Sequence, residues 1–361
     1  MPRLWIAVDA HGGDFIPQNP IEGSILALRE LSGMDFGITL VGDERVIEQQ
    51  LAGRFRGSDR IRVLHSTQVV RMDDDPMAAL RSKKGSSIHV GIAAVRDRQV
   101  DGFFSAGNTG AVTYIARHLL RCVDNVVQPP IAATFPTLAG PKVVLDVGAS
   151  VNCKPIHLVQ FGLMGAVYAQ HVLGIEHPRI GLMSNGEEDT KGSWAIVGDK
   201  ETLGANGIFR LLNGNGIYFH GNVQGNDAFD GPADVIVCDG FVGNVLLKAA
   251  EGEFNAIKGA VGNVIRSGGW SQKIFATVSG ILLGPTITAM KHLFAYEKYG
   301  GLPLLGVNGV IIIGHGKSTP VAIMNAIGNA VRSAEHRIDS HIKDCLQKHA
   351  GILNTPPPPA G

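Results

Sequence analysis

The 361-residue chain has no excess of charge, few cysteines and no long apolar run. Lys plus Arg and Asp plus Glu each total 32, so bulk charge gives no reason to expect a nucleic-acid partner. The four cysteines, Cys122, Cys153, Cys238 and Cys345, lie far apart and without zinc spacing, which predicts reduced thiols and no metal site. No apolar run reaches the roughly 18 to 20 residues of a membrane span. The first residues do not resemble a signal peptide, so we expect a cytoplasmic protein.

The chain also lacks an internal linker rich in proline and serine. We therefore expect one domain over residues 1–349, followed by a disordered proline-rich tail over residues 350–361. Glycine, by contrast, is abundant: 47 residues, well above the usual share of about 7%. This abundance predicts many tight turns and close approaches of the backbone.

A strand, a polar glycine-rich turn and a helical pattern recur along the chain. This order is typical of an α/β fold, and we expect three layers with a mostly parallel sheet between helices. In such sheets ligands bind beyond the carboxyl ends of the strands, so the turns predict one shared crevice. The nine runs that begin these units are "LWIAVDAHGGD", "GITLVGD", "RIRVLHS", "DGFFSAGNTG", "KVVLDVGASVN", "RIGLMSNGEE", "GIYFHGNVQGND", "DVIVCDGFVGN" and "GVIIIGHGKST".

Residues 254–305 lack the rhythm of strand and turn, and they are apolar with scattered lysines. We interpret this segment as a helical excursion from the sheet. Its apolar residues either pack against the body or a second subunit, or form a hairpin that touches a membrane. Ile281, Leu282 and Leu283, followed by Gly284-Pro285, are the candidates for membrane or acyl-chain contact.

The run "GVIIIGHGKST" ends like a nucleotide-binding loop. A Walker A loop requires a glycine five residues before Gly316, and Ile311 stands there, so we do not expect a nucleotide hydrolase. A smaller anion still suits a short glycine-rich turn that opens a helix. His315 lies between Gly314 and Gly316, where it is either a structural residue or a catalytic one.

Two further motifs offer anion contacts. In "DAHGGD", Gly12 and Gly13 allow a close approach to a ligand, although the motif also fits a turn in which Asp9 caps a helix. In "SAGNTGA", Asn108 and Thr109 open a helix among small residues, which suits a phosphate.

Three other motifs carry charge at predicted strand ends or helix starts. "RSKKGSS" combines lysines with a Ser86/Ser87 helix cap, and it fits either an anion site or a solvated basic turn. The acids of "SNGEEDTKG" fit proton transfer, pairing with Lys191, or simple exposure to water. "CDGFVGNVLLK" supplies Asp239 and Asn244 at another strand end. None of these sets has the spacing of a metal site.

Taken in order, these motifs resemble those of the phosphate acyltransferases of bacterial phospholipid synthesis, the PlsX family. The resemblance runs from "IAVDAHGGD" through "RSKKGSS", "SAGNTGA", "SNGEE", "GNVQGND" and "ADVIVCDGFVGNVLLK" to "KYGGLPLLGVNGVIIIGHGKS" and "AIMNAI". The chain departs from the family pattern at His11, Gln224, Asn226 and Lys317, and these positions are not assigned as essential.

The resemblance implies a homodimer with a fold similar to isocitrate and isopropylmalate dehydrogenases and to phosphotransacetylase. It implies transfer of a long-chain acyl group from acyl carrier protein to inorganic phosphate, without a cofactor. The acyl phosphate would then pass to a membrane glycerol-3-phosphate acyltransferase. A short-chain phosphate acyltransferase, a decarboxylating dehydrogenase of similar fold and a non-enzymatic anion-binding module remain alternatives, although we find no acid cluster for the dehydrogenase's metal.

We expect phosphate to attack the thioester directly, because only Cys153 is placed to act as a nucleophile and Pro155 suggests a turn there. The candidate catalytic residues are Asp9, Asn185, Glu187, Lys191, Asp239 and His315. The candidate phosphate-binding residues are Gly12, Gly13, Lys84, Ser86, Ser87, Gly107, Asn108, Thr109, Gly110, Asn244, Gly314 and Gly316.

Overall fold

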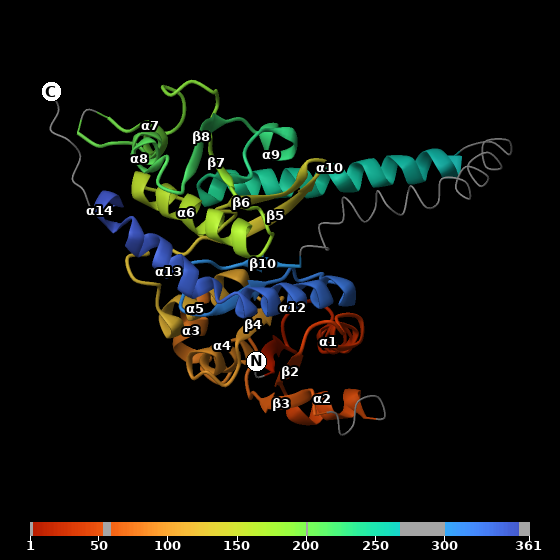
Figure 1. Cartoon of the computed structure of the whole chain (residues 1–361). Coiled ribbons are helices and arrows are strands. Elements are labelled where there is room, and N and C mark those ends of the chain that lie inside the picture. The colour runs from red at the N-terminus through yellow and green to blue at the C-terminus, as the bar shows by residue number, and fades with distance from the viewer. Residues whose placement is uncertain (1–2, 53–58, 200, 268–299, 354–361) are drawn as a thin grey trace.

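The computed structural model describes residues 3–52, 59–199, 201–267 and 300–353, and its strands divide between two sheets (Figure 1). In chain order the strands are β1 (Leu4–Asp9), β2 (Phe36–Gly42), β3 (Ile61–His65), β4 (Gly102–Ser105), β5 (Ala132–Thr137), β6 (Gly140–Leu145), β7 (Arg179–Met183), β8 (Tyr218–Val223), β9 (Val235–Val237), β10 (Leu302–Pro303) and β11 (Val310–Ile313).

The first sheet has the order β10-β11-β4-β1-β2-β3, and the second has the order β5-β6-β9-β7-β8. Among the described strands, β10 pairs with β11 and β5 pairs with β6 in antiparallel fashion, and the other pairs are parallel. The predicted α/β class with mostly parallel pairing is therefore confirmed. In the first sheet, β11, β4 and β1 are neighbours, so the loops that follow them leave the same edge of the sheet side by side.

Helices cover both faces of each sheet, as the three-layer prediction requires (Figure 1). They are α1 (Gln18–Glu30), α2 (Glu44–Leu51), α3 (Pro76–Ser82), α4 (Ser87–Arg96), α5 (Thr109–Leu120), α6 (Pro155–His171), α7 (Trp194–Val197), α8 (Ala205–Leu212), α9 (Asp227–Asp230), α10 (Gly240–Ser267), α12 (Pro320–Glu335), α13 (Ile338–Lys348) and α14 (Ala350–Leu353).

Two apolar layers form the core, because successive strand residues point to opposite faces. Ile6 and Val8 of β1 and Val143 of β6 lie in one layer, together with residues of α1, α6, α12 and α13. Ala7 and Val144 lie in the other layer, together with residues of α3, α4, α5, α9 and α10. Both layers run through both sheets, which supports the assignment of residues 1–349 to one domain; that assignment stays a prediction.

The antiparallel strands β5 and β10 were not among the predicted strands. β5 contains Pro136 and β10 contains Pro303, and each strand lies at an edge of its sheet, where a missing N–H is tolerated. A bridge between Ile131 and Leu304 lies beside them and links the segments that lead into the two sheets. The prediction that the helical excursion extends to residue 305 was wrong at this end. Gly300 and Gly301 both have positive φ, and the strand β10 at Leu302–Pro303 follows them directly.

The first four residues of the segment that we predicted to be disordered are ordered. Residues Ala350–Leu353 form α14, and Ile352 and Leu353 pack against the apolar core, which orders the start of this segment. The rest of the tail and the three candidate contact residues Ile281, Leu282 and Leu283 lie outside the described residues. No helix in the described part of the chain is long and apolar enough to cross a membrane.

Candidate functional site

The carboxyl ends of β1 and β4 are joined by a buried carboxylate. Asp9 is 1% exposed. Its Oδ1 accepts a hydrogen bond from the His11 N–H at 2.9 Å, and its Oδ2 accepts one from the Ser105 hydroxyl at 2.7 Å. Burial raises the pKa of Asp9, while hydrogen bonds from Ser87 and Ser105 oppose that rise. Asp9, a predicted catalytic residue, therefore holds the start of α4 and the loop after β4 against β1.

The glycines after β1 let the loops come unusually close. A Cβ atom on Gly12 would lie 2.6 Å from the Asp9 carboxylate and 2.8 Å from the Gly107 nitrogen. Gly13 has a φ of +111°, and a Cβ there would lie 3.0 Å from the Gly316 carbonyl oxygen. Both positions therefore require glycine for geometric reasons. The predicted phosphate-binding residues Gly12, Gly13, Gly107 and Gly316 are brought together.

Asn108 has its side chain committed to the protein itself. Its amide nitrogen lies 3.0 to 3.3 Å from the carbonyl oxygens of the turn at residues 71–74, and its Oδ1 caps α5 by accepting from the Ala111 N–H. The backbone N–H groups of Thr109 and Gly110, in the first turn of α5, have no acceptor within the helix. We therefore expect an anion here to meet the main chain of α5 instead of the Asn108 amide.

The motif "RSKKGSS" places a second helix start beside the first. Ser86 is fully buried and caps α4 by accepting from the His89 N–H at 3.3 Å. Ser87 donates to Asp9, so both predicted hydroxyls have partners inside the protein. Lys84 is exposed, whereas the neighbouring Lys83 pairs with Asp74. Of the two lysines of this motif, Lys84 is therefore the one open to an incoming anion, and Arg81 at the end of α3 is exposed as well.

The loop after β11 contacts the loops that follow β4 and β1. The Gly314 N–H donates to the Ser105 carbonyl at 2.8 Å, and the Gly316 carbonyl accepts from the Asp14 N–H at 2.8 Å. His315 is exposed, and its Nδ1 accepts from the Lys317 N–H at 3.2 Å, which leaves Nε2 as the nitrogen that can carry a proton. We call the loops at residues 9–14, 84–87, 105–110 and 314–318 the first-sheet loops.

A second group of candidates follows the strands of the other sheet. Asn185, Glu187 and Lys191 are exposed on the loop after β7. Glu187 lies 3.5 Å from the Gln224 amide, and the carbonyl of Lys191 accepts from the Asn222 side chain at 3.1 Å. The side-chain hydrogen bonds of this loop go to β8, to the loop after β8 and, through Asp189, to α8.

Asp239 and Asn244 lie at the start of α10, after β9. The Asp239 carboxylate accepts from the N–H groups of Phe241 and Val242 at 3.0 and 2.9 Å, so it caps the first turn of α10. Asn244 is exposed one turn further along the helix. The structure thus gives two groups of predicted residues, one at each sheet, with the hydrogen bonds described above confined to each group.

Asp146 is a buried residue at the second sheet that the sequence interpretation missed. It is fully buried after β6, and its carboxylate accepts from the N–H groups of Ile131, Gly148 and Ala149 at 3.0 to 3.1 Å. Burial raises its pKa against these hydrogen bonds. The signal was present in the sequence, because Asp146 directly follows the apolar strand of "KVVLDVG", much as Asp9 ends the apolar strand of "LWIAVDAHG".

The cysteines near this carboxylate are poorly ionised. Burial raises the pKa of Cys153 to about 12, and the negative charges of Asp146 and Asp239 contribute to this rise. Cys238 is buried, and its pKa is raised well above the ordinary value for the same reasons. All four cysteines are free. Neither Cys153 nor Cys238 therefore has the thiolate character that a nucleophile needs.

The first-sheet loops have the features of an anion site. Two helix starts, a glycine-rich loop and an exposed lysine meet around a buried carboxylate, and main-chain N–H groups at helix starts favour negative charge. In the described part of the chain no group of three or more His, Cys, Asp or Glu side chains is arranged to hold a metal ion. The chemistry open to this site is the holding of a compact anion by the main chain.

The fold is that of known phosphotransacylases. A phosphotransacetylase from Streptococcus pyogenes matches with a TM-score of 0.58 at 13% identity, over 92% of this chain and 94% of that chain. A branched-chain phosphotransacylase from Enterococcus faecalis V583 matches with a TM-score of 0.56 at 13% identity, over 92% and 99% of the two chains. At this identity the likeness shows the fold, and it confirms the expected similarity to phosphotransacetylase.

The family follows from closer relatives. The family model described as "Fatty acid synthesis protein" matches residues 4–340. Proteins named phosphate acyltransferase are 40% identical in Leptospira biflexa, over 97% of this chain and 99% of the relative, and 41% identical in Pelotomaculum thermopropionicum, over 95% of each. The chain belongs to the phosphate acyltransferase family, and the resemblance seen in its motifs is confirmed.

Proposed function

We propose that this enzyme transfers a long-chain acyl group from acyl carrier protein to inorganic phosphate and releases an acyl phosphate. The observation that carries the proposal is the meeting of the starts of α4 and α5 with the glycines after β1 and β11 around Asp9. Membership of the phosphate acyltransferase family supports the reaction type.

Phosphate would lie among the first-sheet loops, held by the N–H groups of Thr109 and Gly110 and approached by the exposed Lys84. A phosphate oxygen attacks the thioester carbonyl carbon, the C–S bond breaks, and the carrier leaves as a thiolate that takes up a proton. Phosphate is largely ionised near neutral pH, so positioning and donors for the developing oxyanion matter more than activation of the nucleophile. We assign the acyl donor's side of the site to Asn185, Lys191 and the start of α10.

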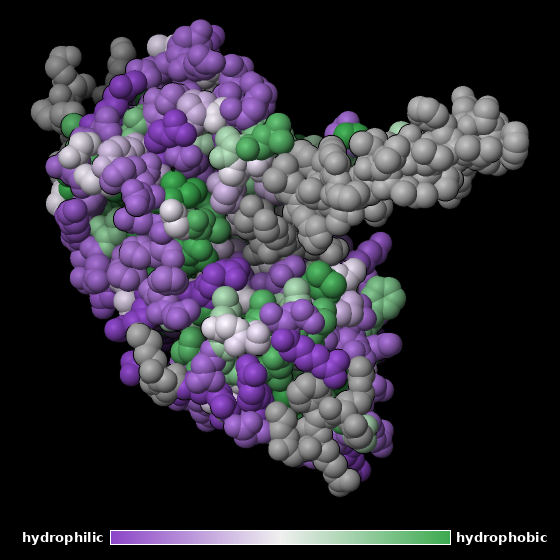
Figure 2. Space-filling model, turned by 45° about the vertical axis from the view of Figure 1, so that its right-hand side comes forward, coloured by the Kyte–Doolittle hydropathy of each residue, from purple (hydrophilic) through white to green (hydrophobic). Residues whose placement is uncertain are grey.

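The preference for a long chain is supported by apolar surface that begins beside the second group of candidates. Phe241 and Val245 lie one turn apart on α10 and are 62% and 52% exposed. The face in Figure 2 likewise shows apolar patches within a largely hydrophilic surface. An acyl chain gains about 0.8 kcal/mol for each CH₂ group it buries, so such a surface favours long acyl groups.

Transfer of a short acyl group is the second candidate, because the solved structures with this fold include phosphotransacetylases. The test incubates the full chain and phosphate with long-chain acyl carrier protein, or with short-chain acyl coenzyme A, and traps acyl phosphate with hydroxylamine. We expect phosphate-dependent product from the carrier thioester. Product from the short-chain thioester alone would favour the second candidate, and no product from either would reject both.

We further propose that the protein is a homodimer, that it passes acyl phosphate to a membrane glycerol-3-phosphate acyltransferase, and that it touches the membrane peripherally. The adjacent apolar residues Ile281, Leu282 and Leu283 motivate the last point. Replacing Leu282 and Leu283 with Glu should reduce sedimentation with liposomes while turnover in solution is retained. If the parent protein never sediments with liposomes, the membrane proposal fails.

A further inference from the structure

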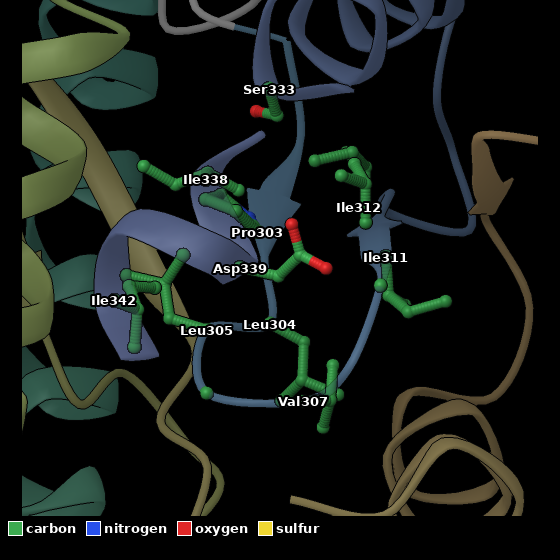
Figure 3. A pocket seen from close by; sticks show the side chains of 13 residues that line it. Pro303, Leu304, Leu305, Val307, Ile311, Ile312, Ser333, Ile338, Asp339 and Ile342 are labelled. Carbon is green, nitrogen blue, oxygen red and sulfur yellow. The ribbon is translucent and has the colours of Figure 1, made fainter. Parts of the chain in front are cut away.

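A cavity of about 490 Å³ lies at the opposite edge of the second sheet from the candidate site. Residues Glu176–Pro178 and Asn215–Ile217 line it, and they precede β7 and β8, whereas Asn185 to Lys191 follow β7. Its other wall is formed by α6 and α13. The volume falls within the range of small-molecule sites, roughly 300 to 1,000 Å³. By contrast, the cavity of about 10 Å³ between β10, β11 and α13 (Figure 3) has room for about one water.

Four histidines line the larger cavity. The rings of His171 on α6 and His341 on α13 stack with their centroids 3.9 Å apart and an interplanar angle of 12°. His177 lies with its ring centroid 5.0 Å from that of Tyr218, on a third side. Three elements that are distant in the sequence thus bring ionisable rings to one cavity.

His349 provides an independent indication of a missing partner. It lines the cavity at the end of α13 and is 5% exposed, yet its Nε2 has no hydrogen-bond partner in the described part of the chain. A buried polar nitrogen without a partner is uncommon and calls for an explanation. A ligand atom that accepts a hydrogen bond from Nε2 would explain this nitrogen. Protonation of the ring beside a bound anion would explain it as well.

The charges on the cavity wall depend strongly on protonation. Lys348 on α13 faces the cavity with the four imidazoles, and the opposing charges are Glu176 before β7 and Asp344 on α13. Tyr218 and Cys345 also line the cavity. His336, at the end of α12, does not line it but contributes to lowering the pKa of His171. With neutral imidazoles, the two carboxylates outweigh the lysine. With protonated imidazoles, the cavity becomes a cluster of positive charge.

Burial is the main cause that lowers the pKa of His171 and of His349; the neighbouring His341 and His336 add to the effect at His171, and Lys348 adds to it at His349. Burial therefore favours neutral rings at these two positions. An anion would reverse that preference, because opposite charge stabilises the imidazolium form. Apolar residues of the lining, Ala166, Val167 and Ile217, leave room for an uncharged organic part beside the charged groups.

We propose that this cavity binds an organic phosphate monoester and that its histidines take up protons when the ligand binds. A compact phosphate can accept hydrogen bonds from a lysine and several imidazolium rings at once, and the apolar wall suits a sugar or a heterocyclic group. The site is separate from the candidate catalytic loops, so binding here does not depend on the acyl-transfer proposal.

The test is isothermal titration of the full chain with ribose 5-phosphate and with adenosine monophosphate, at about pH 6 and about pH 8, in two buffers of different ionisation enthalpy. We expect affinity for at least one probe to be about tenfold tighter at the lower pH, with net proton uptake. The monoester itself carries less charge at the lower pH, so its own ionisation predicts the opposite trend. No saturable binding, or tighter binding at the higher pH, would overturn the proposal.

Variants on α13 locate the bound probe. Lys348→Ala should weaken binding about tenfold, and His341→Gln should reduce the number of protons taken up. Lys343→Ala is the matched control, because Lys343 lies on the same helix but pairs with Asp124 at 2.9 Å and does not line the cavity. Equal effects of the Lys343 and Lys348 variants, or none from Lys348→Ala and His341→Gln, would place the probe elsewhere and refute the assignment.

Discussion

Replacing Cys153 with alanine is expected to leave acyl transfer to phosphate nearly unchanged. The thiol lies near two carboxylates, and its sulfur is 3.7 Å from the Ser150 carbonyl oxygen. Burial and these charges raise its pKa from 9.0 to about 12, which makes the thiolate roughly a thousandfold rarer at a given pH. At about pH 7.5, only about three thiols in 100,000 would be ionised. A mechanism through an acyl-cysteine would start from this small fraction.

The assay measures initial rates of acyl phosphate formation by hydroxylamine trapping, with phosphate and acyl carrier protein thioester varied in turn. Cys153→Ala should keep kcat within about twofold, and the rates should fit a ternary complex instead of ping-pong behaviour. Cys345→Ala is the control, since burial raises the pKa of Cys345 to about 11 and the residue lies away from the strand ends. An acyl group found on Cys153 by mass spectrometry, or loss of activity in a folded Cys153→Ala variant, would refute direct attack.

Three further variants test the site and the stability of the fold. Gly12→Ala should cost about 1 to 3 kcal/mol in urea unfolding and raise the KM for phosphate, because the new Cβ would lie 2.6 Å from the Asp9 carboxylate; wild-type values for both would contradict the close packing. Asn108→Ala should lower the free energy of unfolding by about 2 kcal/mol, because it removes the α5 cap and the hydrogen-bond donor of three carbonyl groups. A raised KM for phosphate with unchanged stability would instead show that the Asn108 amide binds phosphate directly. His349 has a lowered pKa in the folded state, so its contribution to stability is present above the unfolded value near 6.5 and is lost as pH falls below it. Thermal unfolding should therefore show His349→Gln to be less sensitive to acid than the parent, by at most about 1.4 kcal/mol per pH unit, and an identical pH dependence would refute this.

The sequence determined the class of the fold through local patterns. Nine short apolar runs ending in polar turns predicted nine strands, and each is a strand in the structure: β1 to β4, β6 to β9 and β11. Most of these runs can be recognised because a parallel strand buried on both faces is almost continuously apolar, although the edge strands β3 and β8 are partly exposed. The two strands that were missed, β5 and β10, are antiparallel edge strands that contain proline, so neither composition nor rhythm marks them.

The motifs taken in order also determined the family, because several weak signals at the expected sequence positions are specific together. They did not determine the role of each side chain. Asn108, Ser86 and Asp239 have the residue types of ligand-binding groups, but in the structure each one caps a helix. The sequence pattern of a polar residue at a strand end is the same whether its side chain binds a ligand or hydrogen-bonds to the neighbouring backbone.

Only the tertiary structure decided which motifs meet. Gly13 and Gly316 lie about 300 residues apart, yet the Asp14 N–H donates to the Gly316 carbonyl, because β11 pairs with β4 and β4 pairs with β1. The strand order also separates Asp9, at the end of β1, from Asp146, directly after β6, because these two strands belong to different sheets. Strand order depends on long-range packing of apolar faces, and local patterns carry no information about which faces will pack together.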